Sequence, residues 1–409
     1  MTAKTTVQLR TTPMNKYALR KEMFPVTDHC VYFNHAAVGP LSTPAYQAME
    51  KQARDQRDYG ALHWREWYGE YVHYRREASR LIGSDPGEIS ILKNTSEGIS
   101  FVAEGLRWER GDNVITTDME FPSNYVPWKR LERRGVECRQ IRSRQGEFFI
   151  EDIEPLIDAR TRLLTVSSVS FHNGFAPDLV ALGQLCRDRN ILLCVDAIQS
   201  LGAMTMNVRE MNISFLAADG HKWMLGPEGT ALFFVAAEAR EMLEVFESGW
   251  TNIDRGGKFI GCETGLLNDG RRFEAGSANT IGIYGARASL GLLNGIGIDV
   301  IEREVVRLAN LLRDRLHSIG FVSGLSSPTQ SGIVGVTPPV VDLDRLRQKI
   351  GEIPGGISDR STAILLLHRW LEIHDIICAP REGMLRFSPH FYNDEREIER
   401  VVEVLAEAL

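Results

Sequence analysis

Two segments of the chain place groups capable of carbonyl chemistry directly behind apolar runs. In VDAIQSLG, Asp196 follows the apolar run ILLCV. In ISFLAADGHKWMLGPEG, Gly220, His221 and Lys222 follow the next such run, twenty-six residues further on. A lysine amine that is partly removed from water has a lowered pKa, and the neutral amine can form an imine with an aldehyde. The pattern therefore predicts that Lys222 is a nucleophile toward a carbonyl group.

The carboxylate of Asp196 has a chemistry that complements this lysine. Opposite a pyridine nitrogen it would keep that nitrogen protonated and make the ring an electron sink. Taken alone, an aspartate at a strand end is more often a cap or an ion-pair member, and a lysine is more often solvated. The coincidence of both residues with a glycine-rich turn after Lys222 favours a shared site.

The elements that must position these residues are strands. Between about residues 75 and 235, short apolar runs alternate with helical patterns, which is typical of a mostly parallel, doubly wound α/β sheet. Asp196 and Lys222 are expected at its crevice, because ligands of such sheets bind beyond the carboxyl ends of the strands. The predicted strands are 88–92, 113–117, 162–169, 191–197 and 213–218, and 181–189 is a predicted helix.

The whole chain divides into three predicted parts. Residues 1–28 are polar and rich in threonine, and we expect an N-terminal arm that orders only on a partner. Residues 29–294 would form the large sheet domain. Residues 295–409 would form a smaller α+β C-terminal domain, which opens with the amphipathic helix 299–316 and ends with a helix at 395–409.

The composition argues against nucleic-acid-binding and membrane proteins. The net charge of −7 over 409 residues offers no basic excess for a nucleic acid, so no nucleic-acid partner is expected. No apolar run approaches the roughly 20 residues that span a bilayer, and no membrane association is expected. The six cysteines are widely spaced without a C-x-x-C pair, which favours reduced thiols and a cytoplasmic location. A small-molecule substrate fits best.

The segments VDAIQSLG and ADGHKWMLGPEGTALFF resemble the cofactor motif of the class V aminotransferase family. This family contains cysteine desulfurases, selenocysteine lyases, kynureninases and isopenicillin N epimerase-like enzymes, and the resemblance spans about residues 30 to 405. It implies the PLP-dependent transferase fold type I and pyridoxal 5'-phosphate (PLP) as cofactor. By this resemblance, Lys222 carries PLP as an imine and Asp196 pairs with the pyridine nitrogen. Gln199 then hydrogen-bonds the ring oxygen, and His221 reaches the phosphate.

Further cofactor contacts follow from the same resemblance. Thr95 and Ser96, in LKNTSEGIS, open a predicted helix whose free N–H groups suit a phosphate, although simple capping explains them as well. Phe121, in DMEFPSNYVPW, stands where the family lays an aromatic residue on the ring. The desulfurase branch has histidine at this place. Phenylalanine can stack but cannot carry a proton, so acid–base steps must come from Lys222, water or another group.

Two residues depart from the desulfurase pattern. Phe171 stands where desulfurases commonly have an asparagine near the ring oxygen, and Asp219 stands where a phosphate-binding serine or threonine is common. These departures favour the epimerase-like branch of the family.

A later segment suggests a second subunit. RRFEAGSANTIGIYG resembles the family loop that reaches the phosphate of the neighbouring subunit, with Ser277 as the contact, and Trp250 and Thr251 are further candidates. A surface loop is the alternative. The aromatic stretch 59–74 favours helix packing or a dimer interface over a substrate contact. We therefore expect a homodimer with shared active sites.

The substrate side is expected near Arg386. In GMLRFSPHFYND this arginine lies on a probable strand, with Ser388 and His390 on the same side by period two. The family uses the arginine at this place to clamp the substrate carboxylate, which suits its planar fork, whereas an ordinary ion pair is the alternative. YFNHAAVGPLS resembles the N-terminal substrate-side segment, so Asn34 and His35 are candidate substrate contacts.

The reaction is less determined than the cofactor, because PLP does not itself choose among racemisation, transamination and β-elimination. Cys378 lies eight residues before Arg386, which leaves little room for the mobile cysteine loop of desulfurases and favours a buried cysteine. We expect a lyase that performs β-elimination, similar to a C–S lyase, on an amino acid or amino-acid conjugate. An epimerase or aminotransferase is the alternative, and a cysteine desulfurase is less favoured. A non-catalytic PLP-binding protein is disfavoured, because it needs no carboxylate clamp.

Overall fold

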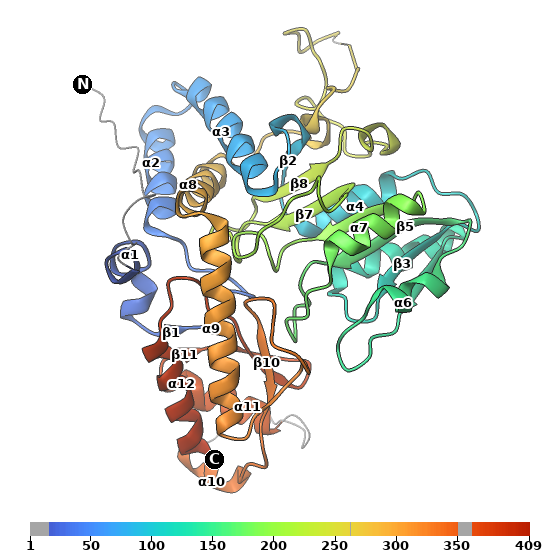
Figure 1. Cartoon of the computed structure of the whole chain (residues 1–409). Helices are drawn as coiled ribbons and strands as arrows, with labels where there is room; N and C mark the ends of the chain where they lie inside the picture. Colours follow the sequence, from blue (N-terminus) through green and yellow to red (C-terminus); the bar gives the residue numbers. More distant parts are fainter. Residues whose placement is uncertain (1–15, 262, 351–361) are drawn as a thin grey trace.

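A seven-stranded sheet forms the centre of the chain (Figure 1). The computed structural model describes residues 16–261, 263–350 and 362–409. The strand order is β2-β8-β7-β6-β5-β3-β4. β8 runs antiparallel to β2 and β7 and the remaining pairs are parallel, so the predicted mostly parallel sheet is confirmed. The strands are β2 (Ile89–Leu92), β3 (Asn113–Thr117), β4 (Glu137–Ile141), β5 (Thr161–Ser167), β6 (Leu192–Asp196), β7 (Phe215–Asp219) and β8 (Ala231–Val235).

The strands that carry the candidate residues lie in the middle of this sheet. Every residue of β7 is buried, and all residues of β6 after Leu192 are buried, as expected for strands covered on both faces. β6 ends at Asp196 and the parallel β7 ends at Asp219, so both carboxylates emerge at the same edge.

Helices cover the sheet and hold its edge. α4 packs on β7 and α7 packs on β6. A close approach at Gly98 seats α4, because a Cβ there would lie only 2.9 Å from the Cβ of Ala217 on β7. The larger helices of this part of the chain are α2 (Thr43–Tyr59), α3 (Trp64–Ile82), α4 (Thr95–Gly105), α7 (Leu179–Asp188) and α8 (Thr280–Ile296). α2, α3 and α8 pack together beside the sheet (Figure 1).

The C-terminal part builds a second hydrophobic core around an antiparallel sheet of order β12-β13-β10-β9. The predicted helices at 299–316 and 395–409 are confirmed as α9 and α12. The chain enters this part at Gly297, where α8 ends and α9 begins. Its elements are α9 (Ile298–Ser318), β9 (Val322–Ser323), β10 (Val334–Thr337), α10 (Leu343–Ile350), α11 (Thr362–Glu372), β11 (Ile376–Ile377), β12 (Ala379–Arg381), β13 (Met384–Phe387) and α12 (Glu395–Ala408).

The segment after residue 28 joins this C-terminal part. β1 (Val31–Tyr32) pairs in parallel with β11, and Phe33 lies in the C-terminal core. A chain segment from the N-terminal side thus forms a separate two-stranded sheet with the C-terminal part, although the sequence places it in the large domain. The predicted domain boundaries themselves stay a prediction.

Part of the predicted N-terminal arm also packs on the chain. Residues 16–23 form α1 (Lys16–Met23), and Phe24 is fully buried, with its ring stacked 3.8 Å from that of Tyr392. Arg20 lies 2.9 Å from carboxylate oxygens of Asp394 and Glu397. This part of the arm is therefore held by its own chain, through contacts to residues far away in sequence. Residues 1–15 lie outside the described residues.

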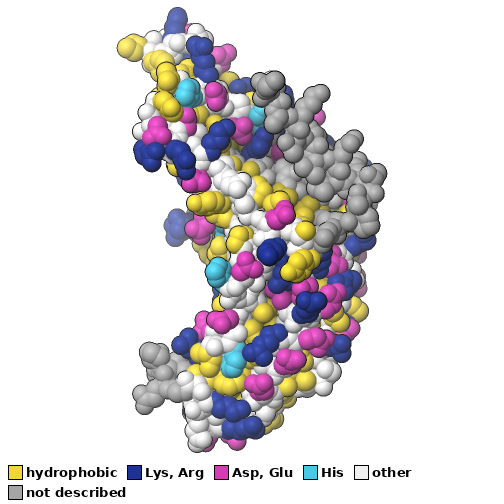
Figure 2. All heavy atoms as spheres, turned by 90° about the vertical axis from the view of Figure 1, so that its left-hand side faces the viewer, with side chains coloured by type: hydrophobic (Ala, Val, Ile, Leu, Met, Phe, Trp, Pro, Cys, Tyr) yellow, Lys and Arg dark blue, Asp and Glu magenta, His cyan; other side chains and the backbone are white. Residues whose placement is uncertain are grey.

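The surface carries charges of both signs, interspersed over the face seen in Figure 2. No helix of the described residues is long and apolar enough to cross a membrane. Large hydrophobic side chains are exposed around α3 and the turn before it, namely Tyr59, Leu62, Trp64, Tyr68 and Val72.

Candidate active site

Lys222 and Asp196 lie within electrostatic reach of each other at the carboxyl edge of the sheet. Burial lowers the pKa of Lys222 to about 8, although the charge of Asp196 opposes this shift. Burial raises the pKa of Asp196 to about 6, and this shift is opposed by the Ile198 N–H, which donates to the carboxylate at 3.0 Å, and by Lys222. An amine with such a pKa is partly neutral near pH 7 and can act as a nucleophile.

The turn that carries Lys222 is held by a distant segment. The N–H of Gly39 donates to the carbonyl of His221 at 2.7 Å. A Cβ at position 39 would lie 2.2 Å from the carbonyl oxygen of Lys222, so only glycine allows this approach. The segment YFNHAAVGPLS, which the sequence assigned to the substrate side, therefore also supports the lysine turn.

Gln199 ties three parts of the site together. Its Oε1 accepts a hydrogen bond from Trp223 Nε1 at 3.0 Å, and its Nε2 donates to the carbonyl of Ala36 at 3.0 Å. The amide thus links the end of β6 to the residue after Lys222. One N–H of Nε2 is left for the predicted contact with a ring oxygen.

The first turn of α4 points at the same edge. Asn94 caps the helix, with its side chain accepting from the N–H of Glu97 at 2.9 Å. The N–H groups of Thr95 and Ser96 are among those that lack an acceptor inside the helix, and such groups suit a phosphate. Thr95 Oγ1 accepts from the N–H of Asp219 at 2.9 Å, which anchors this helix start to the end of β7.

Asp219 faces His221, two residues further on. His221 Nδ1 lies 3.1 Å from Asp219 Oδ2. Among the described residues, however, neither His221 Nδ1 nor Asp219 Oδ1 has a hydrogen-bond partner. Asp219 therefore lies beside His221 without a hydrogen bond that fixes the imidazole, at a position where the sequence had pointed only to a departure from a phosphate-binding residue.

Phe121 presents an open ring beside the lysine. Its side chain is 43% exposed, and Lys222 Nζ lies 5.8 Å from the ring centroid. The edge of one ring meets the face of the other between Phe121 and Phe171, with centroids 5.3 Å apart. The free face of Phe121 is thus available for the ring stacking that the resemblance implies.

Arg386 is an uncompensated buried cation. It lies on β13 with 2% exposure, and its Nη1 donates to the carbonyl of Phe171 at 2.8 Å. Among the described residues, its buried Nε and Nη2 have no hydrogen-bond partner. Burial, together with the charge of Arg381, lowers the pKa of Arg386. The free edge of this guanidinium matches a carboxylate, which accepts two parallel N–H bonds.

His35 has a different role from the predicted one. Its Nδ1 lies 2.7 Å from the carbonyl oxygen of Ser388 and its Nε2 lies 2.6 Å from the hydroxyl of Tyr392. Both ring nitrogens of this fully buried residue are occupied, so His35 braces its segment and offers no nitrogen to a substrate. Asn34 forms a bridge with Ser388, and its Oδ1 is buried without a partner, which leaves it as a candidate contact.

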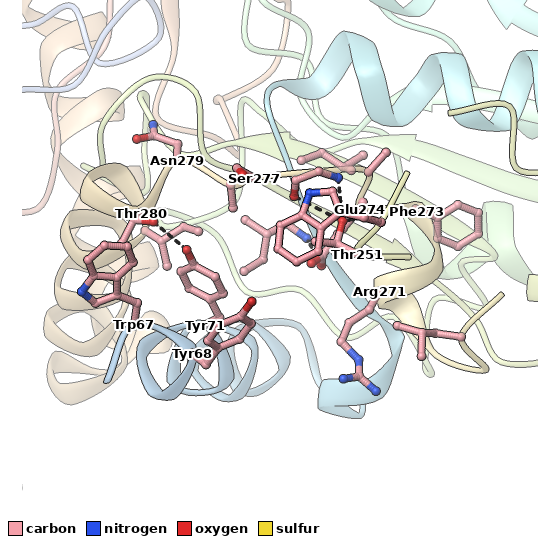
Figure 3. Close-up of a pocket in the computed structure, with 18 of the residues that line it drawn as sticks. Trp67, Tyr68, Tyr71, Thr251, Arg271, Phe273, Glu274, Ser277, Asn279 and Thr280 are labelled. Carbon is pink, nitrogen blue, oxygen red and sulfur yellow. Dashed lines mark hydrogen bonds between the residues drawn. The ribbon is translucent and has the colours of Figure 1, made fainter. Parts of the chain in front are cut away.

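Trp250, Thr251 and Ser277 gather elsewhere in the chain. They line a cavity of about 820 Å³ between α3 and the segments that precede α8 (Figure 3). Thr251 Oγ1 donates to the carbonyl of Glu274 at 2.6 Å. Among the described residues that line this cavity, neither Lys222 nor its cofactor-side neighbours occur. Within one chain, the three residues are therefore not brought to the lysine.

The model of the family described as Aminotransferase class-V matches residues 31–401. The chain belongs to this family. It is 31% identical over 402 residues to a probable cysteine desulfurase of Methanothermobacter thermautotrophicus, which covers 95% of this chain and 97% of the relative. It is also 28% identical over 386 residues to the uncharacterized aminotransferase YcbU of Bacillus subtilis, covering 94% and 96% of the two chains.

Solved structures agree with the class-V assignment. The apo cysteine desulfurase of Thermococcus onnurineus superimposes with a TM-score of 0.82 at 26% identity, over 96% of this chain and 97% of that one. The cystine C–S lyase C-DES, solved with its product cysteine persulfide, superimposes with a TM-score of 0.83 at 22% identity. This match covers 94% of the present chain and 99% of C-DES. The predicted family and the predicted fold, PLP-dependent transferase fold type I, are confirmed.

Glu120 lies beside Asp196 and was not singled out from the sequence. Glu120 accepts hydrogen bonds from the N–H and the hydroxyl of Ser167 at 2.7 and 2.5 Å, and Ser167 is the register partner of Asp196. Burial raises the pKa of Glu120 to about 8, and the charge of Asp196 adds to this shift. A second carboxyl group thus lies beside Asp196, and its signal was an acidic residue directly before Phe121.

Proposed function

We propose that this class-V protein is a PLP-dependent lyase that breaks the bond between the β-carbon and sulfur of a cysteine-type amino acid. The observation that carries the proposal is the free, buried guanidinium edge of Arg386 within electrostatic reach of Lys222. A carboxylate bound there would hold the α-carbon of an amino acid beside a nucleophilic amine. That arrangement serves chemistry at an amino acid and has no evident structural use.

The residues present fit PLP. The groups that would meet the cofactor are the first turn of α4, the remaining N–H of Gln199 Nε2 and the open face of Phe121. Thr95, Ser96 and His221 would hold the phosphate, and Asp196 would hold the pyridine nitrogen protonated. When bound, PLP supplies an electron sink that weakens the bonds at the substrate α-carbon.

Three side chains, those of Arg386, Lys222 and Phe121, determine what the protein contributes to the reaction. Arg386 would bind the α-carboxylate and fix which α-carbon bond faces the lysine. The neutral amine of Lys222 would take the α-proton at Nζ. Phe121 has no titratable group, so the sulfur that departs from the β-carbon would be protonated by water or leave as an anion. For cysteine, the reaction consumes one water molecule and gives pyruvate, ammonia and hydrogen sulfide.

A cysteine desulfurase is the second candidate, because two of the relatives described above carry that name. None of the relatives described above is named an epimerase, so desulfuration, which ranked below epimerisation on sequence, now ranks above it. Desulfuration needs a thiolate to accept the sulfur. Ala379 is the register partner of Arg386 and faces the site, so Cys378 faces the opposite side, in the C-terminal core. Burial raises the pKa of Cys378 far above its ordinary value.

Product analysis separates these reactions. We expect purified holoenzyme to release pyruvate and ammonia from both substrates, together with cysteine persulfide from L-cystine or hydrogen sulfide from L-cysteine. Desulfuration would give alanine instead, and epimerisation would give the D-amino acid with no loss of sulfur. Pyruvate measured by lactate dehydrogenase coupling and amino acids measured by chiral chromatography distinguish all three outcomes.

Cys378→Ala is the matched control. Because the thiol is buried away from the site, we expect the variant to keep its rate within about twofold, with only a modest loss of stability. Formation of alanine by the wild-type protein would contradict the lyase proposal. If alanine formation were lost in Cys378→Ala and in no other cysteine variant, the protein would be a desulfurase that uses Cys378.

We further propose a homodimer in which Ser277, Trp250 and Thr251 complete the partner's site. Among the described residues that line their cavity, the only lysine is Lys93, which pairs with Glu97, and α3 beside the cavity exposes Trp64 and Tyr68. Exposed aromatic groups of this kind are typical of protein interfaces.

Mixing two impaired variants tests the shared site. Lys222→Ala removes the amine, and Ser277→Asp places a negative charge where the phosphate of the partner's cofactor is expected. If subunits exchange freely, half of the dimers are hybrids with one intact site each, so we expect about a quarter of the wild-type activity to return. A mixture that stays as inactive as its components, although native mass spectrometry detects hybrids, would contradict the shared site.

A further inference from the structure

Arg381 projects from the same face of the small sheet as Arg386. In the antiparallel pair β12 and β13, Ala379 is opposite Arg386 and Arg381 is opposite Met384. Opposite residues share a face, and so do residues two apart on one strand, so the two arginines are diagonal neighbours on one side. Side chains in this relation lie within reach of a single ligand.

The face of the small sheet that carries Arg381 and Arg386 lies against the loop after β5, at the reactive edge of the large sheet. Gly335 on β10 is the other register partner of Arg386, and a Cβ there would lie 2.5 Å from the carbonyl oxygen of His172. Arg386 itself donates to the neighbouring carbonyl of Phe171. The loop after β5 therefore lies directly against the face that carries both arginines.

Arg381 has no acidic partner among the described residues. Its one described hydrogen bond runs from Nη1 to the carbonyl of the preceding Pro380, at 2.7 Å. The next residue, Glu382, is exposed at the turn between the strands, and no ion pair joins it to Arg381 within the described part of the chain. The guanidinium is partly exposed and keeps most of its donors free.

Two acidic and two basic side chains act on the charge of Lys222. Asp196 and Asp219 favour its charged form, while Arg386 and Arg381 oppose it. Asp196 faces the cofactor nitrogen in the proposed function, and Asp219 lies 3.1 Å from His221 Nδ1. The two guanidinium groups remain for the substrate. The guanidinium of Arg386 matches the α-carboxylate. The guanidinium of Arg381 has no anionic group to bind when the substrate side chain is uncharged.

We propose that Arg381 binds a second anionic group of the substrate, so that the enzyme prefers cysteine derivatives whose sulfur substituent ends in a carboxylate. This inference rests on the proposed function, because it concerns the same site. Arg386 would hold the α-carboxylate, and its diagonal neighbour Arg381 would bind a carboxylate at the distal end of the sulfur substituent. Arg381 would then determine which substituents the enzyme prefers.

Two ligands of equal size test the inference. S-(2-Carboxyethyl)-L-cysteine and S-(2-carbamoylethyl)-L-cysteine differ only in the charge of their ends. We expect wild-type holoenzyme, titrated rapidly while its visible cofactor spectrum is recorded, to bind the acid about tenfold more tightly than the amide. Arg381→Gln should abolish this difference by weakening acid binding alone, and Arg381→Lys should restore part of it. Arg345→Gln, on the exposed face of α10, is the matched control.

The outcomes separate the inference from the function on which it rests. Equal affinity of wild-type protein for the two ligands overturns the role of Arg381 alone. Equal weakening of both ligands in Arg381→Gln, in a variant with unchanged thermal stability, also overturns it, because it indicates a structural role. A wild-type cofactor spectrum that neither ligand nor L-cysteine changes overturns the proposed function and the inference together.

Discussion

Replacement of Lys222 with alanine is expected to lower turnover by at least about 10³-fold, because the variant loses both the amine that holds the cofactor and the base that takes the α-proton. Borohydride reduction should fix PLP covalently to wild-type protein, and the modified peptide should contain residue 222. The variant should release its cofactor on dialysis after the same treatment. Mass spectrometry of the digested protein measures the modification directly.

Lys129→Ala is a suitable control, because Lys129 is exposed and pairs with Glu132 on the surface. It should keep full modification and activity. Covalent PLP on a lysine other than Lys222, or a Lys222→Ala variant with wild-type turnover, would contradict the assignment.

The same lysine sets a pH dependence for cofactor uptake. Because the pKa of Lys222 is lowered to about 8, the neutral amine is the minor form below this pH and the major form above it. The rate at which apoprotein captures PLP should therefore fall about tenfold for each pH unit below about 8 and level off above it. A rate that keeps rising toward pH 10 would indicate an ordinary solvated lysine.

The placement of Asp196 and Lys222 at one edge of the sheet was predicted from local sequence, whereas their roles stay a prediction. The apolar runs before Asp196 and Lys222 are long enough to identify two central strands, and parallel neighbours bring their ends to one edge without further information. Gln199 and His221 closely follow these strand ends, so the same strands also determine their positions. The family and the fold followed from the same short segments.

The parts that escaped prediction depend on pairings between distant residues. His35 is occupied by Ser388 and Tyr392, more than 350 residues away, and nothing near His35 in the sequence announces these partners. The common face of Arg381 and Arg386 depends on the register of two short strands, which a shift of one residue would reverse. A sequence pattern alone cannot fix such a register.

The free edge of Arg386 also predicts a conflict between function and stability. A buried cation without a carboxylate partner costs solvation free energy that the folded chain alone does not recover. Arg386→Leu should therefore raise the free energy of unfolding of the cofactor-free protein by about 1–3 kcal/mol, provided that the smaller side chain leaves no large cavity. Thermal denaturation followed by circular dichroism measures this change.

The same substitution should abolish useful catalysis. Loss of the carboxylate clamp removes a charge-assisted, bidentate contact, so kcat/KM should fall about 10³-fold, most of it through a higher KM. Arg386→Lys separates charge from shape: it keeps the buried cation but not the planar fork, so we expect it to lose most of the activity without the gain in stability. If Arg386→Leu were less stable than wild-type protein while Arg386→Lys kept full activity, the arginine would be a structural cation, and the substrate carboxylate would have to be bound elsewhere. A stable, inactive leucine variant instead shows that the chain tolerates an unsatisfied charge because its partner arrives with the substrate.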